Sequence, residues 1–334
     1  MNNEQVLLTQ YPEGMPEDDT FQYEETELKE PQDKEVQVES IYISVDPYMR
    51  GRMSQADSYV EPFEVGKPIE SHIVGKIIQS KSSQFQEGDI VLGNLPWKRI
   101  NTVNEEDVDK VADTDVPLHL YLGTLGLTGQ TAYHGLLDIG RPQEGETVVV
   151  SAASGAVGAV VGQIAKLKGA NVVGIAGGDK KVNYLTDELG FDVGVDYKKG
   201  NFAEALAEAV SNGVDVYYEN VGGEIGDEVF KHLNRHARIP VCGTISNYNN
   251  PEDDQGPRIQ STLIKKQAMM RGFLVAEFAD DFENAGKDLA QWVKEGKIKT
   301  KVSIEEGFDK LPQAFRNLFT GDNFGKQVVK VSED

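Results

Sequence analysis

The segment 148–170 constrains the fold of this chain more strongly than any other part of its sequence. A run of valines, 148–150, predicts a buried parallel strand, and small residues interrupt it directly afterwards. Apolar residues then recur at the spacing of one helical face, at Val157, Val160, Val161, Ile164 and Ala165. Strand, small-residue turn and helix together form the pyrophosphate-binding unit of a Rossmann fold, because the backbone has to approach the phosphates at the helix N-terminus.

The turn within this unit has the pattern Ala153-x-Gly155-x-x-Gly158, with alanine in place of the first glycine. Alone, a glycine pattern is weak evidence, but its position between a strand and a helix makes it specific. The sequence therefore predicts that a dinucleotide binds at Ala153, Gly155, Ala156, Val157 and Gly158. The alternative is a glycine-rich helix that packs without a ligand.

The 334 residues are sufficient for two domains. Residues 1–122 contain short β-patterned runs at 36–43, 73–78 and 89–92, whose spacing is typical of a compact barrel. From residue 123 onward, short apolar strands alternate with helical patterns, which predicts a doubly wound parallel sheet. The six strands expected in this sheet are 148–150, 172–176, 193–195, 214–218, 238–242 and 272–275.

The tail, residues 300–334, returns to short strands around 300–304 and 327–331, which flank a helical pattern. It is too short to fold alone, so we expect it to complete the N-terminal domain. The expected fold class is α/β, with a β-barrel domain (1–122, completed by 300–334) and a Rossmann domain (123–299).

The net charge of −22 argues against nucleic acid or an anionic membrane as a partner, because the field of the protein repels both. No stretch reaches the roughly 18 apolar residues of a membrane span, and residues 1–10 lack the apolar core of a signal peptide. The single cysteine, Cys242, excludes an internal disulfide and fits a reducing compartment. We therefore expect a cytoplasmic protein.

The end of the second expected Rossmann strand decides between NAD and NADP. Asp179 lies at about the distance where NAD enzymes hold the ribose 2′-hydroxyl with an acid. Two glycines precede it, however, so we expect Asp179 to cap the next helix instead. Lys180 or Lys181 then meets a 2′-phosphate, and NADP is the favoured cofactor.

Polar or small residues follow several later strands at the edge where a Rossmann fold binds its ligand. Tyr197 is expected to stack on adenine, and Asn220 and the backbone of 242–244 to line the nicotinamide ribose. Each of these residues, taken singly, is also an ordinary turn residue. Their common edge is what favours a cofactor site.

A metal site is not expected. Zinc dehydrogenases of similar size hold the metal with cysteine and histidine, and this chain has one cysteine. Its five histidines are scattered; Glu228, His232 and His236 share a helical spacing, but we expect that helix to end at Asn234. The chain is therefore interpreted as metal-free.

Hydride addition without a Lewis acid favours a conjugated enone or enal, in which negative charge collects on the carbonyl oxygen. A hydrogen-bond donor has to meet that oxygen, and a proton has to reach the α-carbon. Tyr48 and Tyr248 are the candidate donors. Both are also compatible with ordinary turn or surface positions.

Seven motifs in one order resemble those of a known family; they are S-V-D-P-Y-M-R-G-R-M (44–53), L-G-x-T-G-x-T-A-Y (125–133), A-A-S-G-A-V-G-A-V-V-G-Q-I-A-K-L-K-G (152–169), E-N-V-G-G-E (219–224), V-C-G-x-I-S-x-Y-N (241–249), R-G-F-L-V (271–275) and G-D-N-F-G-K (321–326). The chain resembles, over nearly its whole length, the zinc-free medium-chain reductases of the prostaglandin reductase and alkenal double-bond reductase type. The resemblance implies a GroES-like catalytic barrel and a Rossmann domain, usually in a homodimer. It also implies reduction of α,β-unsaturated aldehydes and ketones by NADPH.

The family's site residues carry over onto matching motif positions. Lys181 matches a lysine at the 2′-phosphate, Tyr248 a tyrosine beside the nicotinamide ribose and enone oxygen, and Tyr48 a tyrosine of the substrate pocket. Further cofactor contacts are implied at Tyr197, Asn220, Cys242, Gly243, Phe273, Leu274, Val275 and Asn323. Gln130 departs from the pattern, since an apolar residue is expected there. Two other functions stay open: reduction of quinones, and cofactor binding without turnover in a regulatory or structural role.

Overall fold

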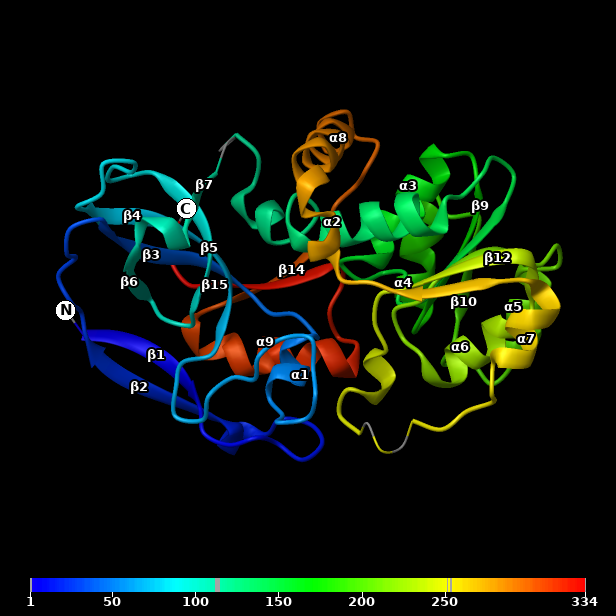
Figure 1. Ribbon diagram of the computed structural model, residues 1–334, viewed down its shortest axis with the longest axis horizontal. Coiled ribbons are helices and arrows are strands. Elements are labelled where there is room, and N and C mark those ends of the chain that lie inside the picture. The colour runs from blue at the N-terminus through cyan, green and yellow to red at the C-terminus, as the bar shows by residue number, and fades with distance from the viewer. Residues whose placement is uncertain (1, 112–114, 251, 253, 334) are drawn as a thin grey trace. The chain divides into compact units, whose positions relative to one another are not determined.

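The computed structural model describes residues 2–111, 115–250, 252 and 254–333 (Figure 1). The chain divides into two compact units. The first unit comprises Met1–Leu122, Val302–Asn323 and Gln327–Asp334, and the second comprises Gly123–Lys301 and Phe324–Lys326. Among the described residues, none of the helices combines the length and hydropathy that crossing a membrane requires.

The first unit is rich in β-structure. Its seven-stranded sheet has the order β14-β15-β3-β4-β5-β7, with β6 paired to β3, and β1 and β2 form a separate antiparallel pair. The strands are β1 (Asn2–Leu8), β2 (Phe21–Glu27), β3 (Glu35–Ser44), β4 (Glu70–Ser80), β5 (Ile90–Pro96), β6 (Ile100–Asn104), β7 (Asp109–Lys110), β14 (Val302–Glu306) and β15 (Lys326–Lys330), and the α-helices are α1 (Met49–Arg52) and α9 (Leu311–Thr320).

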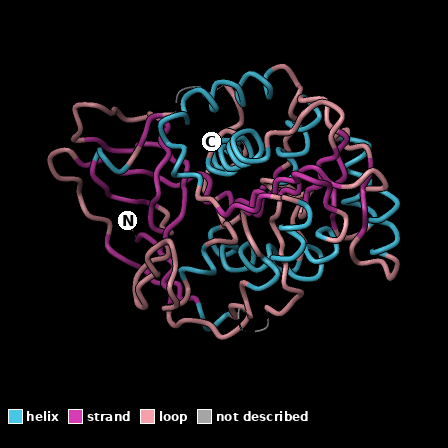
Figure 2. Tube along the Cα trace, turned by 45° about the vertical axis from the view of Figure 1, so that its right-hand side comes forward, coloured by secondary structure: helices cyan, strands magenta, loops and turns pink. Residues whose placement is uncertain are grey.

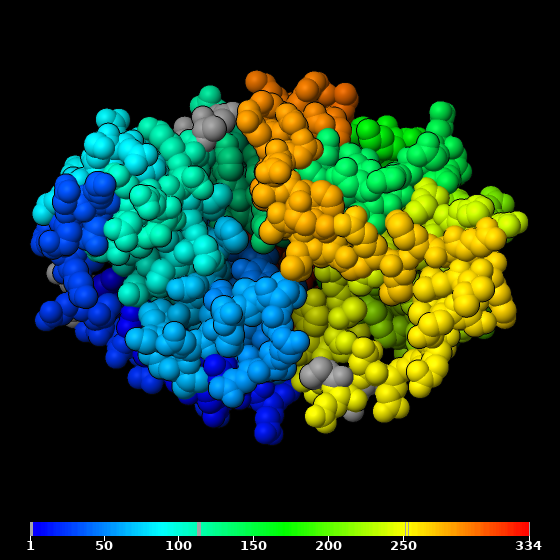
Figure 3. Space-filling view, viewed as in Figure 1, coloured from blue at the N-terminus to red at the C-terminus, as the bar shows by residue number. Residues whose placement is uncertain are grey.

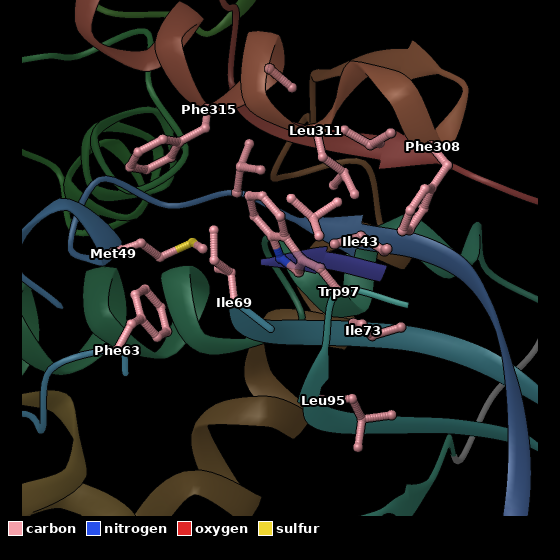
Figure 4. Close-up of a cluster of buried hydrophobic side chains, with 14 of the residues drawn as sticks. Ile43, Met49, Phe63, Ile69, Ile73, Leu95, Trp97, Phe308, Leu311 and Phe315 are labelled. Carbon is pink, nitrogen blue, oxygen red and sulfur yellow. The ribbon is translucent and has the colours of Figure 1, made fainter. Parts of the chain in front are cut away.

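A buried cluster around Trp97 forms the main core of this unit (Figure 4). Trp97 is fully buried, and its indole N–H is satisfied by the Ser71 hydroxyl at 2.8 Å. Helix α9, from the tail of the chain, adds Leu311, Ala314 and Phe315 to the same cluster. These residues lie three and four positions apart, so one face of the helix is buried against the N-terminal strands.

The second unit is built on six parallel strands in the order β10-β9-β8-β11-β12-β13. This order reverses between β8 and β11, as in the doubly wound Rossmann fold that the sequence predicts. Helices lie on both sides of the sheet (Figure 2). The strands are β8 (Thr147–Val150), β9 (Asn171–Ala176), β10 (Val193–Asp196), β11 (Val214–Tyr218), β12 (Leu233–Val241) and β13 (Met269–Gly272).

The α-helices of this unit are α2 (Leu127–His134), α3 (Gly158–Leu167), α4 (Asp179–Asn183), α5 (Phe202–Ala209), α6 (Gly223–Phe230), α7 (Gln260–Lys266) and α8 (Phe282–Lys294). Three elements differ from the sequence prediction, one of them the strand expected at 238–242, which begins earlier, at Leu233. The last strand was expected at 272–275 but ends at Gly272, because Phe273 turns to pack edge-on against Tyr218 with ring centroids 6.4 Å apart. Helix α6 ends at Phe230 and not near Asn234, because the fully buried Leu233 already begins β12.

Candidate functional site

The glycine turn between β8 and α3 is closely packed. The amide of Gly155 donates to the Ala152 carbonyl at 2.9 Å, and Ala152 has a left-handed φ of 48°. A Cβ on Gly158 would lie 2.5 Å from the Ala152 oxygen and 2.9 Å from the Ala153 Cα. Helix α3 carries no acidic residue in its first turn. The positive end of the helix dipole therefore faces no carboxylate of its own first turn, which fits an anionic group such as a pyrophosphate.

Replacing Gly158 tests this packing. We expect Gly158→Ala to lower the free energy of unfolding by about 1–3 kcal/mol and to weaken dinucleotide binding, because backbone atoms cannot move away from the added Cβ. Gly200→Ala is the matched control, since nothing lies within 4 Å of the Cβ it adds. Thermal unfolding and cofactor titration of both variants make the comparison. Equal behaviour of the two variants would contradict the close packing at Gly158.

A short piece of the tail lies on the glycine turn. Gly325 forms a bridge with Gly155, and its amide donates to the Ser154 carbonyl at 2.8 Å. The ring centroid of the preceding Phe324 lies 5.5 Å from the Lys181 ammonium and 4.7 Å from that of Lys301. The sequence analysis did not single out Phe324 or Lys301, although the motif at 321–326 contains Phe324.

The adenosine side of the site begins where β9 ends. Gly178, with φ of 90°, is the N-cap of α4, so the prediction that Asp179 caps this helix is wrong. Asp179 is instead the first helical residue, and its carboxylate accepts a bond from the Lys199 ammonium at 2.6 Å. Glycine suits the cap position because it adopts a positive φ without strain. Lys181 follows in the same turn and is partly buried, whereas Lys180 is exposed.

Tyr197 follows β10 on the same edge of the sheet. Its side chain is 39% exposed, and a Cβ on Gly177 would lie 2.9 Å from its ring. The absent side chain at Gly177 thus lets the Tyr197 ring lie against the backbone at the end of β9. A half-exposed ring held in this way fits the stacking role predicted for adenine.

The ends of β8, β11 and β12 meet at the other side of the turn. The Asn220 side-chain amide donates to the Ser151 carbonyl at 2.8 Å, and the Asn220 backbone amide donates to the Ser151 hydroxyl at 2.9 Å. The amides of Cys242 and Gly243 donate to the Glu219 carbonyl at 2.9 and 3.2 Å. The structure thus brings Asn220, Cys242 and Gly243 together, as the sequence predicts. Ser151 and Glu219 take part in the same hydrogen bonds, and the sequence analysis did not name either of them as a site residue.

Cys242 is partly buried beside Tyr218. Burial raises the pKa of the Cys242 thiol to about 12. The thiol is therefore neutral at physiological pH and is a poor nucleophile, because the thiolate is the reactive form. Cys242 fits an uncharged wall of a cofactor site.

The segment 273–275 follows the edge strand β13. Phe273 is partly buried, with Tyr218 and Phe278 edge-on to its ring at 6.4 and 6.3 Å. Leu274 is 45% exposed, and Val275 begins the 3₁₀-helix η8 (Val275–Asp281). Asn323 belongs to the first unit, so its contact with a cofactor stays a prediction.

Tyr248 follows the 3₁₀-helix η6 (Ile245–Asn247). Its phenol oxygen accepts a bond from the Thr244 amide at 3.4 Å and would lie 2.9 Å from a Cβ on Gly243. This hydrogen bond uses a lone pair of the phenol oxygen and not its proton.

Tyr48 belongs to the first unit, at the start of α1. It packs against the core cluster around Trp97, and the turn beneath it is closed by the Met49 amide, which donates to the Asp46 carbonyl at 3.1 Å. Burial, with a smaller contribution from Asp46, raises the pKa of Tyr48 well above its usual range. Tyr48 is therefore protonated at neutral pH. Its approach to Tyr248 stays a prediction, because the two tyrosines belong to different units.

The described residues contain no group of three or more His, Cys, Asp or Glu side chains that could hold a metal ion. The helical spacing of Glu228, His232 and His236 does not form a cluster, because α6 ends before His232 and His236 lies in β12. His232 Nε2 is 3.6 Å from the Glu228 carboxylate.

Comparisons with known proteins identify the family of this chain. The model of the N-terminal domain of oxidoreductases matches residues 4–111, and the model described as zinc-binding dehydrogenase matches residues 156–291. The NADPH-dependent curcumin reductase of Escherichia coli is 43% identical over 99% of this chain and 98% of its own. The NADP⁺-dependent 2-alkenal reductase of Nicotiana tabacum is 40% identical over 100% of this chain and 99% of its own.

A solved structure gives the same result for the fold. CurA from Vibrio vulnificus in complex with NADPH superposes with a TM-score of 0.95 at 39% identity, covering 99% of this chain and 100% of that one. The relatives span the full length of both units and not the cofactor-binding unit alone. The chain therefore belongs to the medium-chain dehydrogenase/reductase family, in the group of the alkenal and prostaglandin reductases.

Proposed function

We propose that this protein is an NADPH-dependent reductase of the carbon–carbon double bond in α,β-unsaturated aldehydes and ketones. The observation that carries the proposal is the edge of the parallel sheet, where a closed glycine turn, a partly buried lysine and a tyrosine hydroxyl occur together. The names of the full-length relatives, a curcumin reductase and a 2-alkenal reductase, give the substrate class.

The cofactor fits residues along this edge. The turn 153–158 would hold the pyrophosphate, Lys181 the 2′-phosphate and Tyr197 the adenine. Asn220, Cys242 and Gly243, with the segment 273–275, would hold the nicotinamide half. The local cations matter because the protein as a whole is strongly negative, at −22, and the cofactor is an anion.

Bound NADPH supplies a hydride to the β-carbon of the substrate. The chain's own contribution is to meet the negative charge that then develops on the carbonyl oxygen, and we assign this to the hydroxyl of Tyr248. Tyr48, which stays protonated, is a second donor for the substrate. The α-carbon also needs a proton, which a tyrosine hydroxyl of this chain or the ribose 2′-hydroxyl of the cofactor would supply.

We propose that the reaction needs no metal. The support is the donor set: one cysteine, which burial keeps as a neutral thiol, and histidines that do not cluster among the described residues. A catalytic zinc ion is held by three protein ligands drawn from His, Cys, Asp and Glu, and the described residues contain no such group.

The decisive experiment is NADPH oxidation with a medium-chain 2-alkenal in the presence of a chelator, with analysis of the product. A saturated aldehyde as product supports both the double-bond reduction and its independence from metal. An unsaturated alcohol would overturn the proposal. No oxidation despite tight NADPH binding would favour quinone reduction first and a role without turnover second.

We propose further that the protein is a cytoplasmic homodimer that pairs through β13. Within the part of the chain that the structure describes, β13 is paired with β12 on one side and with no strand on the other, and Met269 and Met270 are 43% and 40% exposed. The segment 260–275, drawn from yellow to orange, lies on the face of the molecule seen in Figure 3, and its exposed apolar residues also include Leu274 and Ile264, at 45% and 78%. An open apolar strand edge is a template for a second copy.

Met270→Asp should convert the dimer to a monomer, because the substitution sets two carboxylates at the shared edge. Light scattering after size exclusion gives the mass. Val193→Asp is the control, since Val193 lies on β10, the opposite edge strand, and is 36% exposed. A wild-type monomer, or a Met270→Asp dimer, would argue against pairing through β13.

A further inference from the structure

We propose that Glu219 is a positioning residue for the nicotinamide half of the cofactor. Its carboxylate and backbone together fix the ends of β8, β11 and β12 in the arrangement that Asn220, Cys242 and Gly243 need. The inference rests on the proposed function, because it takes those three residues as the nicotinamide side of the site.

The Glu219 side chain is buried, with 2% of the residue exposed. A single carboxylate oxygen, Oε1, accepts three bonds: from the Ser151 hydroxyl at 3.0 Å and from the amides of Val221 and Gly222 at 2.9 Å each. The donors come from two different connections, the one that follows β8 and the one that leads from β11 to α6. One side-chain atom thus joins the ends of two adjacent strands.

The backbone of the same residue joins the third strand. The Glu219 amide donates to the Pro240 carbonyl at 3.0 Å, and the Glu219 carbonyl accepts the amides of Cys242 and Gly243. Glu219, at the end of β11, is therefore bonded through its side chain to the end of β8 and through its backbone to the end of β12.

The network passes directly to Asn220. The Ser151 hydroxyl donates to Glu219 and accepts from the Asn220 backbone amide at 2.9 Å, so the carboxylate fixes the direction of that hydroxyl. Gly222 and Gly223 follow with φ of 72° and 55°, which gives the sharp turn into α6. Two of the carboxylate's three bonds hold the amides of this turn.

No Lys, Arg or His of the described residues forms an ion pair with Glu219 among the interactions that the structure gives. Oriented N–H and O–H dipoles balance the charge, which makes the arrangement directional. An apolar side chain of similar size would fill the space but would take the acceptor away from the partly buried amides of Val221 and Gly222 and from the Ser151 hydroxyl. This requirement for an acceptor, and not for volume, explains an acidic residue at a buried position.

The affinities for two ligands distinguish a positioning role of Glu219 from a merely structural one. General destabilisation affects both halves of the cofactor site, whereas loss of the Glu219 bonds affects the nicotinamide half. The probe of the adenosine half is 2′,5′-ADP, which carries the 2′-phosphate and lacks the nicotinamide. The probe of the whole site is NADPH.

We expect Glu219→Leu to weaken NADPH binding tenfold or more, while the affinity for 2′,5′-ADP stays within twofold of wild type. Glu219→Gln should recover most of the loss, because the amide oxygen accepts the same two backbone amides and the Ser151 hydroxyl. Val229→Ala is the control for stability: Val229 is fully buried in α6 and outside this network, so its loss should lower the melting temperature and leave the ratio of the two affinities unchanged.

Ser151→Ala is the second variant, for the case that Glu219→Leu does not fold. It removes the hydroxyl that donates to Glu219 and accepts from the Asn220 amide. It should weaken NADPH and leave 2′,5′-ADP unchanged. Parallel loss of both ligands in Glu219→Leu or Ser151→Ala, or no loss of NADPH, overturns the inference. Turnover of a 2-alkenal by the wild-type protein tests the proposed function separately, because the binding comparison does not depend on the substrate.

Discussion

Lys181→Ala should weaken NADPH binding by about 1–3 kcal/mol, or roughly 5- to 150-fold, and leave NADH binding unchanged. The loss is that of a charge-assisted hydrogen bond to the 2′-phosphate, which NADH lacks. Lys181 is partly buried, and its ammonium lies 5.5 Å from the centroid of the Phe324 ring. These contacts restrict the conformations of the Lys181 side chain. Direct titration of both cofactors, followed by fluorescence or calorimetry, measures the difference.

Lys180→Ala is the matched control, because Lys180 is the neighbouring residue in the same helical turn and is exposed. If Lys181 forms a specific bond with the 2′-phosphate, Lys180→Ala should bind NADPH with the affinity of the wild type. Equal losses of NADPH affinity in the two variants would mean that the lysines act only through their overall positive charge. Equal losses of NADPH and NADH in Lys181→Ala would mean that Lys181 does not contact the 2′-phosphate at all.

Tyr248→Phe should lower turnover of a 2-alkenal by about 100-fold, the usual scale for one oxyanion donor. Affinity for NADPH should change little, because the phenyl ring is kept and the bond that the hydroxyl accepts from the Thr244 amide is long, at 3.4 Å. Single-turnover kinetics with saturating cofactor separate the chemical step from binding.

Tyr48→Phe is the informative comparison, since Tyr48 is the other protonated phenol assigned to the substrate. A loss confined to Tyr248→Phe identifies Tyr248 as the donor to the oxyanion. A loss confined to Tyr48→Phe would transfer that role to Tyr48. Unchanged turnover in Tyr248→Phe, with the wild type active, would remove Tyr248 from the mechanism.

The parallel sheet was predictable because its signals are local. Buried strands read as apolar runs, and their alternation with helices requires parallel pairing, so five of the six strands were expected within a few residues of their observed cores. The sixth was shifted, since 272–275 is as apolar as a strand. Only the packing of Phe273 against Tyr218 shows that the chain leaves the sheet there.

The features that the sequence analysis missed depend on contacts between distant residues. Ala152, and not the Ala153 that replaces the usual first glycine, takes the left-handed φ of the glycine turn. Gln130, expected to be apolar, is buried at 7% exposure and donates to the Phe282 carbonyl at 3.0 Å. The sequence pattern does not show that the Phe282 carbonyl accepts a hydrogen bond from the Gln130 amide. It also does not show that three donors bond to the Glu219 carboxylate.

The return of Phe324–Lys326 to the second unit has a consequence for engineering. The cofactor-binding unit is not a continuous stretch of chain, because Gly325 pairs with Gly155 from more than twenty residues beyond Lys301. A fragment cut after Lys301 would lack the segment that covers the Ser154 carbonyl and contacts Lys181. Chimaeras that exchange cofactor preference between relatives therefore have to transfer two separate segments, Gly123–Lys301 and Phe324–Lys326.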